Sequence, residues 1–177
     1  MIHVDRDNPV RGDVHRLLSE HLADMFATSP AESVHALDHS ALSVPSIAFW
    51  TAREDGELLG CGALKLLDPE PGPTLDSSEP RSAAVHGTEL HVAGRLGEIK
   101  SMRTAAAARG RGVATLMLKH IIDHARSQDL ERVCLETGTE DYFAPARCLY
   151  ARHGFTECPP FANYVLDPNS VFMELRL

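Results

Sequence analysis

The sequence predicts a mixed α/β fold, with a single domain spanning residues 1–177. Residues 47–53 and 58–67 both read as strands, and the Glu54-Asp55-Gly56 segment between them is typical of a hairpin turn. After residue 97 the pattern runs strand, helix, strand, and a further helix and strand follow. Paired strands followed by a strand–helix–strand unit indicate a sheet with helices packed on it.

The other elements follow from the spacing of apolar residues. Residues 2–4 predict a first strand and residues 33–38 a second short helix. Between them, helical spacing predicts a helix from Val14 to residues 28–30, with apolar positions Leu17, Leu18, Leu22, Met25 and Phe26. In the second half, the expected elements are a strand at 98–103, a helix at 113–128, a strand at 132–136, a helix at 145–152 and a strand at 171–177. The buried stripe of the helix at 113–128 is expected at Val113, Leu116, Met117 and Ile121.

Residues 68–94 differ from the rest of the chain. They contain four prolines, many small polar residues and little apolar periodicity. A stretch of this length without its own structure is uncommon in a compact domain, so we interpret it as a mobile loop insertion. It either gates a pocket or has no chemical role.

Composition excludes several classes of protein. The formal net charge of −8 argues against a nucleic-acid or anionic-membrane binder. No apolar run approaches the roughly 20 residues that a membrane span needs, and residues 1–6 lack the basic-then-apolar pattern expected of a secretion signal. The four cysteines have neither Cys-x-x-Cys nor zinc-like spacing, which favours free thiols in the cytoplasm.

The segment that carries the chemistry is a turn with two glycines, Gly110 and Gly112, between a strand and a helix. Glycine permits a tight turn and leaves no side chain in front of the peptide N–H groups. With the free N–H groups and the dipole of the helix start, such a turn can bind a phosphate or pyrophosphate. An ordinary helix-entry turn with exposed arginines is the alternative.

Local charge favours the phosphate interpretation. Residues 99–122 contain no Asp or Glu, and five cations lie there: Lys100, Arg103, Arg109, Arg111 and Lys119. The P-loop pattern and the complete Gly-x-Gly-x-x-Gly of dinucleotide folds are both absent. Nucleotide hydrolysis and hydride transfer are therefore less favoured than binding of another phosphate-bearing ligand.

Three segments in order resemble the GNAT acyltransferase superfamily. Arg109-x-x-Gly112-x-Ala114 resembles the Gln/Arg-x-x-Gly-x-Gly/Ala motif, residues 97–104 resemble the family's fourth strand, and residues 149–155 resemble Leu-Tyr-x-x-x-Gly-Phe. Residues 135–138 and 168–173 are similar to a bacterial subgroup of predicted N-acetyltransferases. The resemblance implies three layers: a central, mostly antiparallel, twisted sheet flanked by helices, with its fourth and fifth strands splayed around acyl-CoA.

The resemblance also implies the residues that bind acetyl-CoA, the acyl donor. Backbone N–H groups in the turn that follows Arg109 would hold the coenzyme A pyrophosphate, at Gly110, Arg111, Gly112, Val113 and Ala114. The backbone of Met102, Arg103 and Thr104 would pair with the pantetheine arm, which acts as an added strand. No metal is expected.

Glu98 is the candidate general base. It lies eleven residues before Arg109, as does a Glu used as base in some members of the family that the chain resembles. Alternation places Glu98, Lys100 and Met102 on one strand face. Burial would raise the pKa of the Glu98 carboxyl and Lys100 would lower it. The alternative is a structural Glu98–Lys100 ion pair, with water relaying the proton.

Tyr150 is the candidate general acid, which would protonate the departing coenzyme A thiolate. Its place in Leu-Tyr-x-x-x-Gly-Phe matches the family tyrosine. The alternative is plain core packing.

The acceptor side is less defined. His35 and Asp38 could meet the substrate or lie on an ordinary helix surface, and Trp50 and Tyr164 could line the acceptor pocket. His120 and His124 have the spacing of paired metal ligands, but no third ligand is evident, so we expect exposed histidines.

These observations predict a cytoplasmic N-acetyltransferase that transfers the acetyl group of acetyl-CoA to a primary amine of a small molecule in a ternary complex. Two alternatives stay open: a non-catalytic acyl-CoA-binding module and a protein or peptide N-acetyltransferase. The resemblance is compatible with a homodimer.

Overall fold

The computed structural model describes residues 1–33, 40–67 and 95–177. Seven strands form one sheet in the order β1-β2-β3-β4-β5-β7-β6. The strands are β1 (His3–Arg6), β2 (Ile47–Glu54), β3 (Glu57–Leu67), β4 (Leu96–Thr104), β5 (Arg132–Gly138), β6 (Thr156–Glu157) and β7 (Ser170–Arg176). The helices are α1 (Gly12–Thr28), α2 (Val113–Ser127) and α3 (Ala144–Arg152), with short 3₁₀ turns η1 (Ala31–Ser33), η2 (Ala41–Ser43), η3 (Ala106–Ala108) and η4 (Asp141–Phe143).

The sheet is antiparallel except at one junction. β4 and β5 are parallel, and the connection between them contains α2. The β2–β3 hairpin turns at Asp55 (φ 50°) and Gly56 (φ 85°), the left-handed conformations that a tight hairpin requires. The expected mixed α/β fold with a mostly antiparallel sheet is confirmed.

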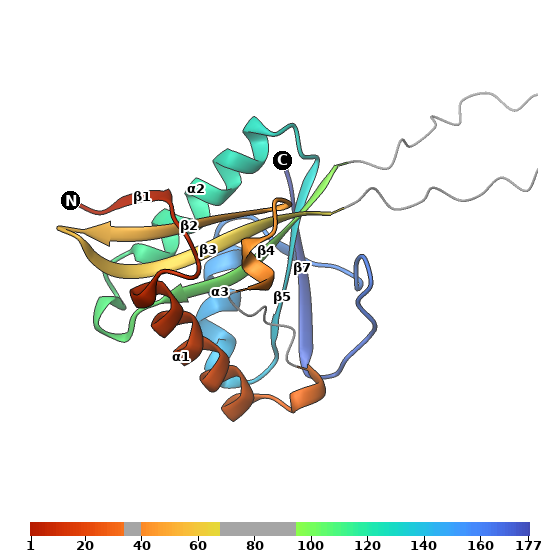
Figure 1. Cartoon of the computed structure of the whole chain (residues 1–177). Coiled ribbons are helices and arrows are strands. Elements are labelled where there is room, and N and C mark those ends of the chain that lie inside the picture. Colours follow the sequence, from red (N-terminus) through yellow and green to blue (C-terminus); the bar gives the residue numbers. More distant parts are fainter. Residues whose placement is uncertain (34–39, 68–94) are drawn as a thin grey trace, which may run out of the picture.

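Helices cover both faces of this sheet. α1 packs on one face, where Leu17 and Leu18 meet Phe49 of β2 in one cluster of buried residues. α2 and α3 cover the other face, where Met117 and Tyr150 belong to a second and larger cluster. Figure 1 shows α1 in front of the sheet and α3 behind it. The predicted three-layer arrangement therefore positions the chain segments that form the site.

The expected helices and long strands are present, with bounds shifted by at most two residues. β6 was missed, because two residues carry no periodic signal. Phe26 and Leu116 were expected in buried stripes but are 58% and 38% exposed, since each lies at the edge of its helix's apolar face. The short helix expected at 33–38 and the insertion expected at 68–94 lie outside the described residues, apart from Ser33 at the end of η1.

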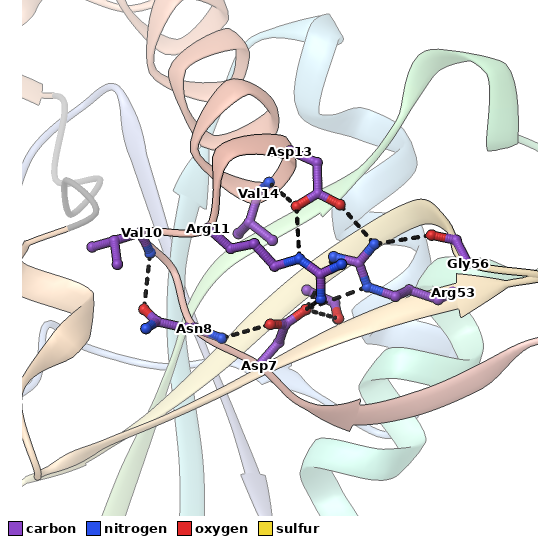
Figure 2. A network of polar contacts seen from close by, with 9 residues as sticks. Asp7, Asn8, Val10, Arg11, Asp13, Val14, Arg53 and Gly56 are labelled. Atoms are coloured by element: carbon purple, nitrogen blue, oxygen red, sulfur yellow. Dashed lines mark hydrogen bonds and ion pairs between the residues drawn. The ribbon is translucent and has the colours of Figure 1, made fainter.

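A polar network fixes the start of α1 against β2. Arg53 donates to Asp7 Oδ2 at 3.0 Å and to Asp13 Oδ2 at 2.7 Å, and Figure 2 shows Arg11 joining the same carboxylates. Burial acts to raise the pKa of Asp7, but hydrogen bonds from the Asn8 N–H, Thr51 and Arg53 outweigh it and lower that pKa. The network holds the chain between β1 and α1, and with it the direction in which α1 crosses the sheet.

Candidate active site

A cleft opens where β4 and β5 separate. The two strands pair only over Leu96–Glu98 and Arg132–Cys134, and beyond these residues they diverge, as Figure 1 shows. The cleft has a volume of about 100 Å³ and is lined from four directions. Ser101 and Met102 come from β4, Glu136 from β5, His21 from α1 and Tyr150 from α3. It therefore reaches residues from both helical layers.

A β-bulge shapes the β4 side of this cleft. Ser101 has φ 52°, and the register with β3 shifts between Cys61 and Ala63, so two β4 residues face one β3 residue. The expectation that Glu98, Lys100 and Met102 share one strand face is therefore wrong for Met102, which follows the bulge. The extra residue turns Met102 toward the α2 side, where it packs against the larger core cluster.

Beyond the bulge, β4 has one unpaired edge. Thr104 and Arg103 pair with Gly60 and Cys61 of β3, whereas no β4 residue after Glu98 pairs with β5 in the described chain. The backbone of Met102, Arg103 and Thr104 therefore has an edge on which an extended ligand could lie.

The predicted phosphate-binding turn is an open, exposed turn. Gly110 and Gly112 have φ 76° and 79°, and a Cβ added at either would meet no atom within 4 Å. α2 begins at Val113 with Gly112 as its N-cap, without a side-chain cap and without an acidic residue in its first turn. The two glycines thus leave open space beside the turn, the first N–H groups of a helix have no intrahelical partner, and this local structure suits a pyrophosphate.

Carboxylates from elsewhere offset part of the basic segment. Arg111 pairs with Glu54 at the end of β2. Arg103 donates to Asp24 Oδ2 of α1 at 2.6 Å and to the Tyr142 hydroxyl at 3.0 Å. Within the described chain, Arg109 makes no ion pair, so its charge is available beside the turn. The sequence alone could not show this neutralisation, because the two carboxylates are distant along the chain.

Glu98 is buried and is not among the residues that line the cleft. It is 3% exposed, and its Oε1 accepts a hydrogen bond from the Tyr164 hydroxyl at 2.6 Å. Lys100 Nζ lies 3.1 Å from the same oxygen and 2.7 Å from the Tyr164 hydroxyl. The Glu98–Lys100 ion pair, considered as the alternative to a catalytic role, is present. Tyr164 thus hydrogen-bonds Lys100, which lines the cleft.

Tyr150 does reach the cleft. Its side chain is 6% exposed, its ring lies 5.6 Å from that of Phe155, and it belongs to both the larger core cluster and the cleft lining. Burial raises the pKa of its phenol, with a further rise from Glu136. Its hydroxyl has no hydrogen-bond partner among the residues that the structure describes. Tyr150 is thus a protonated phenol at the cleft wall.

The structure does not bring Trp50 to the cleft, which corrects that prediction. Trp50 is 2% exposed, because the side chains of α2 and β1 cover it. His120 and His124 contact its ring edge-on at 5.3 and 4.9 Å, and the Arg6 guanidinium lies 4.6 Å from it. These two histidines are therefore half-buried against Trp50, not exposed as expected. His35 and Asp38 lie outside the described residues.

Two polar groups of the cleft region were missed in the sequence. His21 lines the cleft from α1, and Tyr142 of η4 donates to Asp24 at 2.9 Å and so ties η4 to α1. A signal for His21 existed, because it follows Leu17 and Leu18 by four and three residues on the buried stripe of α1. Tyr142 carried no comparable signal.

Two further findings concern metals and membranes. Among residues 1–33, 40–67 and 95–177, no group of three or more His, Cys, Asp or Glu side chains is arranged to hold a metal ion. No helix in this part of the chain is long and apolar enough to cross a membrane.

A sheet split at its parallel junction, with an open glycine turn leading into a helix beside the split, is the arrangement that the resemblance to the GNAT acyltransferases predicts. The chain matches the family model described as "Acetyltransferase (GNAT) family" over residues 14–155. It is 44% identical over 176 residues to the uncharacterized N-acetyltransferase YsnE of Bacillus subtilis, covering 99% of this chain and 100% of that protein. It is 34% identical over 177 residues to an IAA acetyltransferase of Azospirillum brasilense, covering 98% and 97% of the two chains.

Solved structures show the same fold. An acyl-CoA N-acyltransferase structure from Klebsiella pneumoniae has a TM-score of 0.71 at 24% identity, covering 100% of this chain and 98% of that one. A GNAT acetyltransferase from Elizabethkingia anophelis with acetyl-CoA bound has a TM-score of 0.62 at 16% identity, covering 99% and 98%. The chain belongs to the GNAT acetyltransferase family, and it is an acyltransferase.

Proposed function

We propose that this chain transfers the acetyl group of acetyl-CoA to a primary amine of a small molecule, directly, while both substrates are bound. The observation that carries the proposal is the cleft at the β4–β5 separation, which adjoins the unpaired edge of β4 and is lined by a buried tyrosine. A split sheet with one free strand edge can hold an extended donor and leave its reactive end facing the acceptor.

The donor would be held by two backbone surfaces. The N–H groups from Gly110 to Ala114, with the charge of Arg109, would bind the pyrophosphate at the start of α2. The free edge of Met102–Thr104 would pair with the pantetheine amides. When bound, acetyl-CoA supplies the thioester carbon that the amine attacks. The chain would bind and orient the thioester, and its side chains would transfer the protons.

Tyr150 would supply the proton to the leaving thiolate, because it is a protonated phenol at the cleft wall. Glu98 would take part in proton transfer only through Tyr164, Lys100 or water, since its carboxylate is buried beneath them. The small volume of the cleft, about 100 Å³, favours a small acceptor over a peptide.

The test of donor binding is calorimetry with acetyl-CoA on the wild type and on Ala114→Glu. A carboxylate in the first turn of α2 favours the helix dipole, so this variant should fold at least as well as wild type. The same charge would repel a pyrophosphate, and we expect affinity to fall about tenfold or more. Ser19→Glu on the exposed side of α1 is the matched control and should bind as wild type does.

No heat of binding for the wild type at about 1 mM acetyl-CoA would refute the proposal. Coenzyme A release over a panel of amines, amino acids, aminoglycosides and short peptides then tests the acceptor class. Acetylation of peptides alone would identify a peptide N-acetyltransferase, and donor binding without turnover on any acceptor would favour the non-catalytic module.

A further inference from the structure

His21 lines the same cleft as Tyr150, from the other side of the sheet. It belongs to α1, on the face opposite α3, and both side chains border the space between β4 and β5. Each helical layer therefore contributes one titratable side chain to the cleft. A direct transfer moves two protons, because one leaves the amine while another reaches the departing sulfur.

The surroundings of His21 keep its imidazole neutral. Burial lowers its pKa to about 4; Arg103 adds to this shift, and Asp24 opposes it. Arg103 faces it from β4 and Asp24 from its own helix, three residues along the chain. The other charged or titratable side chains that line the cleft are Lys100, Glu136 and Tyr150. At neutral pH one ring nitrogen therefore carries a lone pair, and within the described chain the ring makes no hydrogen bond.

A second observation indicates that the cleft receives a polar ligand. The Ser101 side chain lines it, Ser101 is 8% exposed, and its Oγ has no hydrogen-bond partner in the described structure. A buried hydroxyl without a hydrogen-bond partner is unfavourable relative to a paired one. Such a group at the wall of a cleft is explained if a bound ligand supplies the missing hydrogen bond.

Glu98 is less suited to direct contact with the acceptor. Its Oε1 already accepts from Tyr164 and pairs with Lys100, and it does not border the cleft. His21 borders the cleft, and no residue that the structure describes hydrogen-bonds its ring.

We propose that His21 is the catalytic residue that takes the proton from the acceptor amine, an inference that rests on the proposed function. The neutral amine nitrogen forms a bond to the acetyl carbon, and the bond from that carbon to sulfur breaks. The nitrogen's proton passes to the free ring nitrogen of His21, and the thiolate takes the proton of Tyr150. The imidazolium then releases its proton to water and the phenolate regains one. An amine nitrogen becomes strongly acidic as it becomes an amide, so a weakly basic imidazole suffices.

The test uses hydroxylamine as the acceptor, because it is small and largely uncharged at neutral pH. Rates at saturating acetyl-CoA, corrected for the uncatalysed reaction, are compared for wild type, His21→Ala, His21→Gln and Glu98→Gln. His15→Gln, an exposed position on the same helix, is the control and should match wild type. We expect both His21 variants to lose about tenfold or more in kcat, with the Kd for acetyl-CoA changed by less than about twofold. Added imidazole should restore part of the rate of His21→Ala but not of Glu98→Gln.

Each other outcome has a distinct meaning. Rates of His21→Ala and His21→Gln equal to that of His15→Gln would overturn the role of His21. A loss without imidazole rescue, or with weakened acetyl-CoA binding, would also overturn it, because the residue would then act on structure. Rescue confined to a Glu98 variant would assign the proton to Glu98. If the wild type binds acetyl-CoA but does not accelerate the hydroxylamine reaction, this inference fails while donor binding stands; if it does not bind acetyl-CoA, the proposed function itself fails.

Discussion

Tyr150→Phe separates catalysis from packing at this position. The substitution removes one hydroxyl and leaves the ring, so the contact with Phe155 at 5.6 Å is retained. If Tyr150 only fills the core, turnover should not change. If it protonates the leaving thiolate, turnover should fall while the fold is unaffected.

The expected magnitudes follow from the surroundings of the hydroxyl. A hydrogen-bonded hydroxyl contributes about 1 kcal/mol to stability, but the Tyr150 hydroxyl has no partner in the described chain, so the free energy of unfolding should change by less than about 0.5 kcal/mol. Loss of a general acid typically costs about 10²–10⁴-fold in rate. Because burial raises the pKa of Tyr150, the proton stays available at neutral and mildly alkaline pH.

Urea unfolding, calorimetry with acetyl-CoA and pre-steady-state rates of acetyl transfer measure the three quantities. Tyr142→Phe is the contrasting control. Its hydroxyl is exposed and bonds both Asp24 and Arg103, so that variant should lose about 1 kcal/mol of stability and keep its turnover. An unchanged rate for Tyr150→Phe, with chemistry shown to limit turnover, would refute its role as the acid. A stability loss above about 1 kcal/mol would refute the statement that its hydroxyl is unpaired.

Two further predictions concern stability. In the folded chain the pKa of His21 is lowered from 6.5 to about 4. Between these two pH values the unfolded chain binds a proton at His21 and the folded chain does not, so the free energy of unfolding falls as pH falls. Between pH 7 and pH 5, protonation of His21 should lower the free energy of unfolding by about 2 kcal/mol. In urea titrations His21→Gln should lack this part of the pH dependence. Equal pH dependence in wild type and variant would contradict the lowered pKa of His21. Gly112→Ala should lower the free energy of unfolding by about 1–2 kcal/mol, since Gly112 has φ 79°. Gly12→Ala at the start of α1, where no left-handed backbone is required, should be neutral or slightly stabilising, and equal effects at both glycines would show that φ is not the cause.

The donor side of the site could be predicted from sequence because it is contiguous. The end of β4, the glycine turn and the start of α2 follow one another, so local spacing carries the whole arrangement. The two glycines were enough to indicate the turn, and both have positive φ in the structure.

The acceptor side could not be predicted in the same way. Strict alternation assigned Met102 to the face of Glu98, and the bulge at Ser101 reversed it, because a single left-handed residue shifts every later side chain of the strand. Trp50 looked like a pocket residue, yet tertiary packing against α2 buried it. Which distant carboxylate neutralises Arg103 depends on how α1 crosses the sheet, and no local pattern encodes that crossing.

The junction of β4 and β5 also has a mechanical consequence. Three residue pairs join the strands there, whereas β5 and β7 pair over seven and β2 and β3 over eight. The sheet therefore consists of two well-paired halves, β1 to β4 and β5 to β7, joined by a short stretch of pairing, and α2 connects β4 to β5 along the chain. Amide hydrogens at Leu96–Glu98 should exchange through opening of this short stretch, at a lower free energy than those inside either half. A force that pulls the two halves apart would meet its weakest resistance beside the cleft in which we propose that the substrates bind.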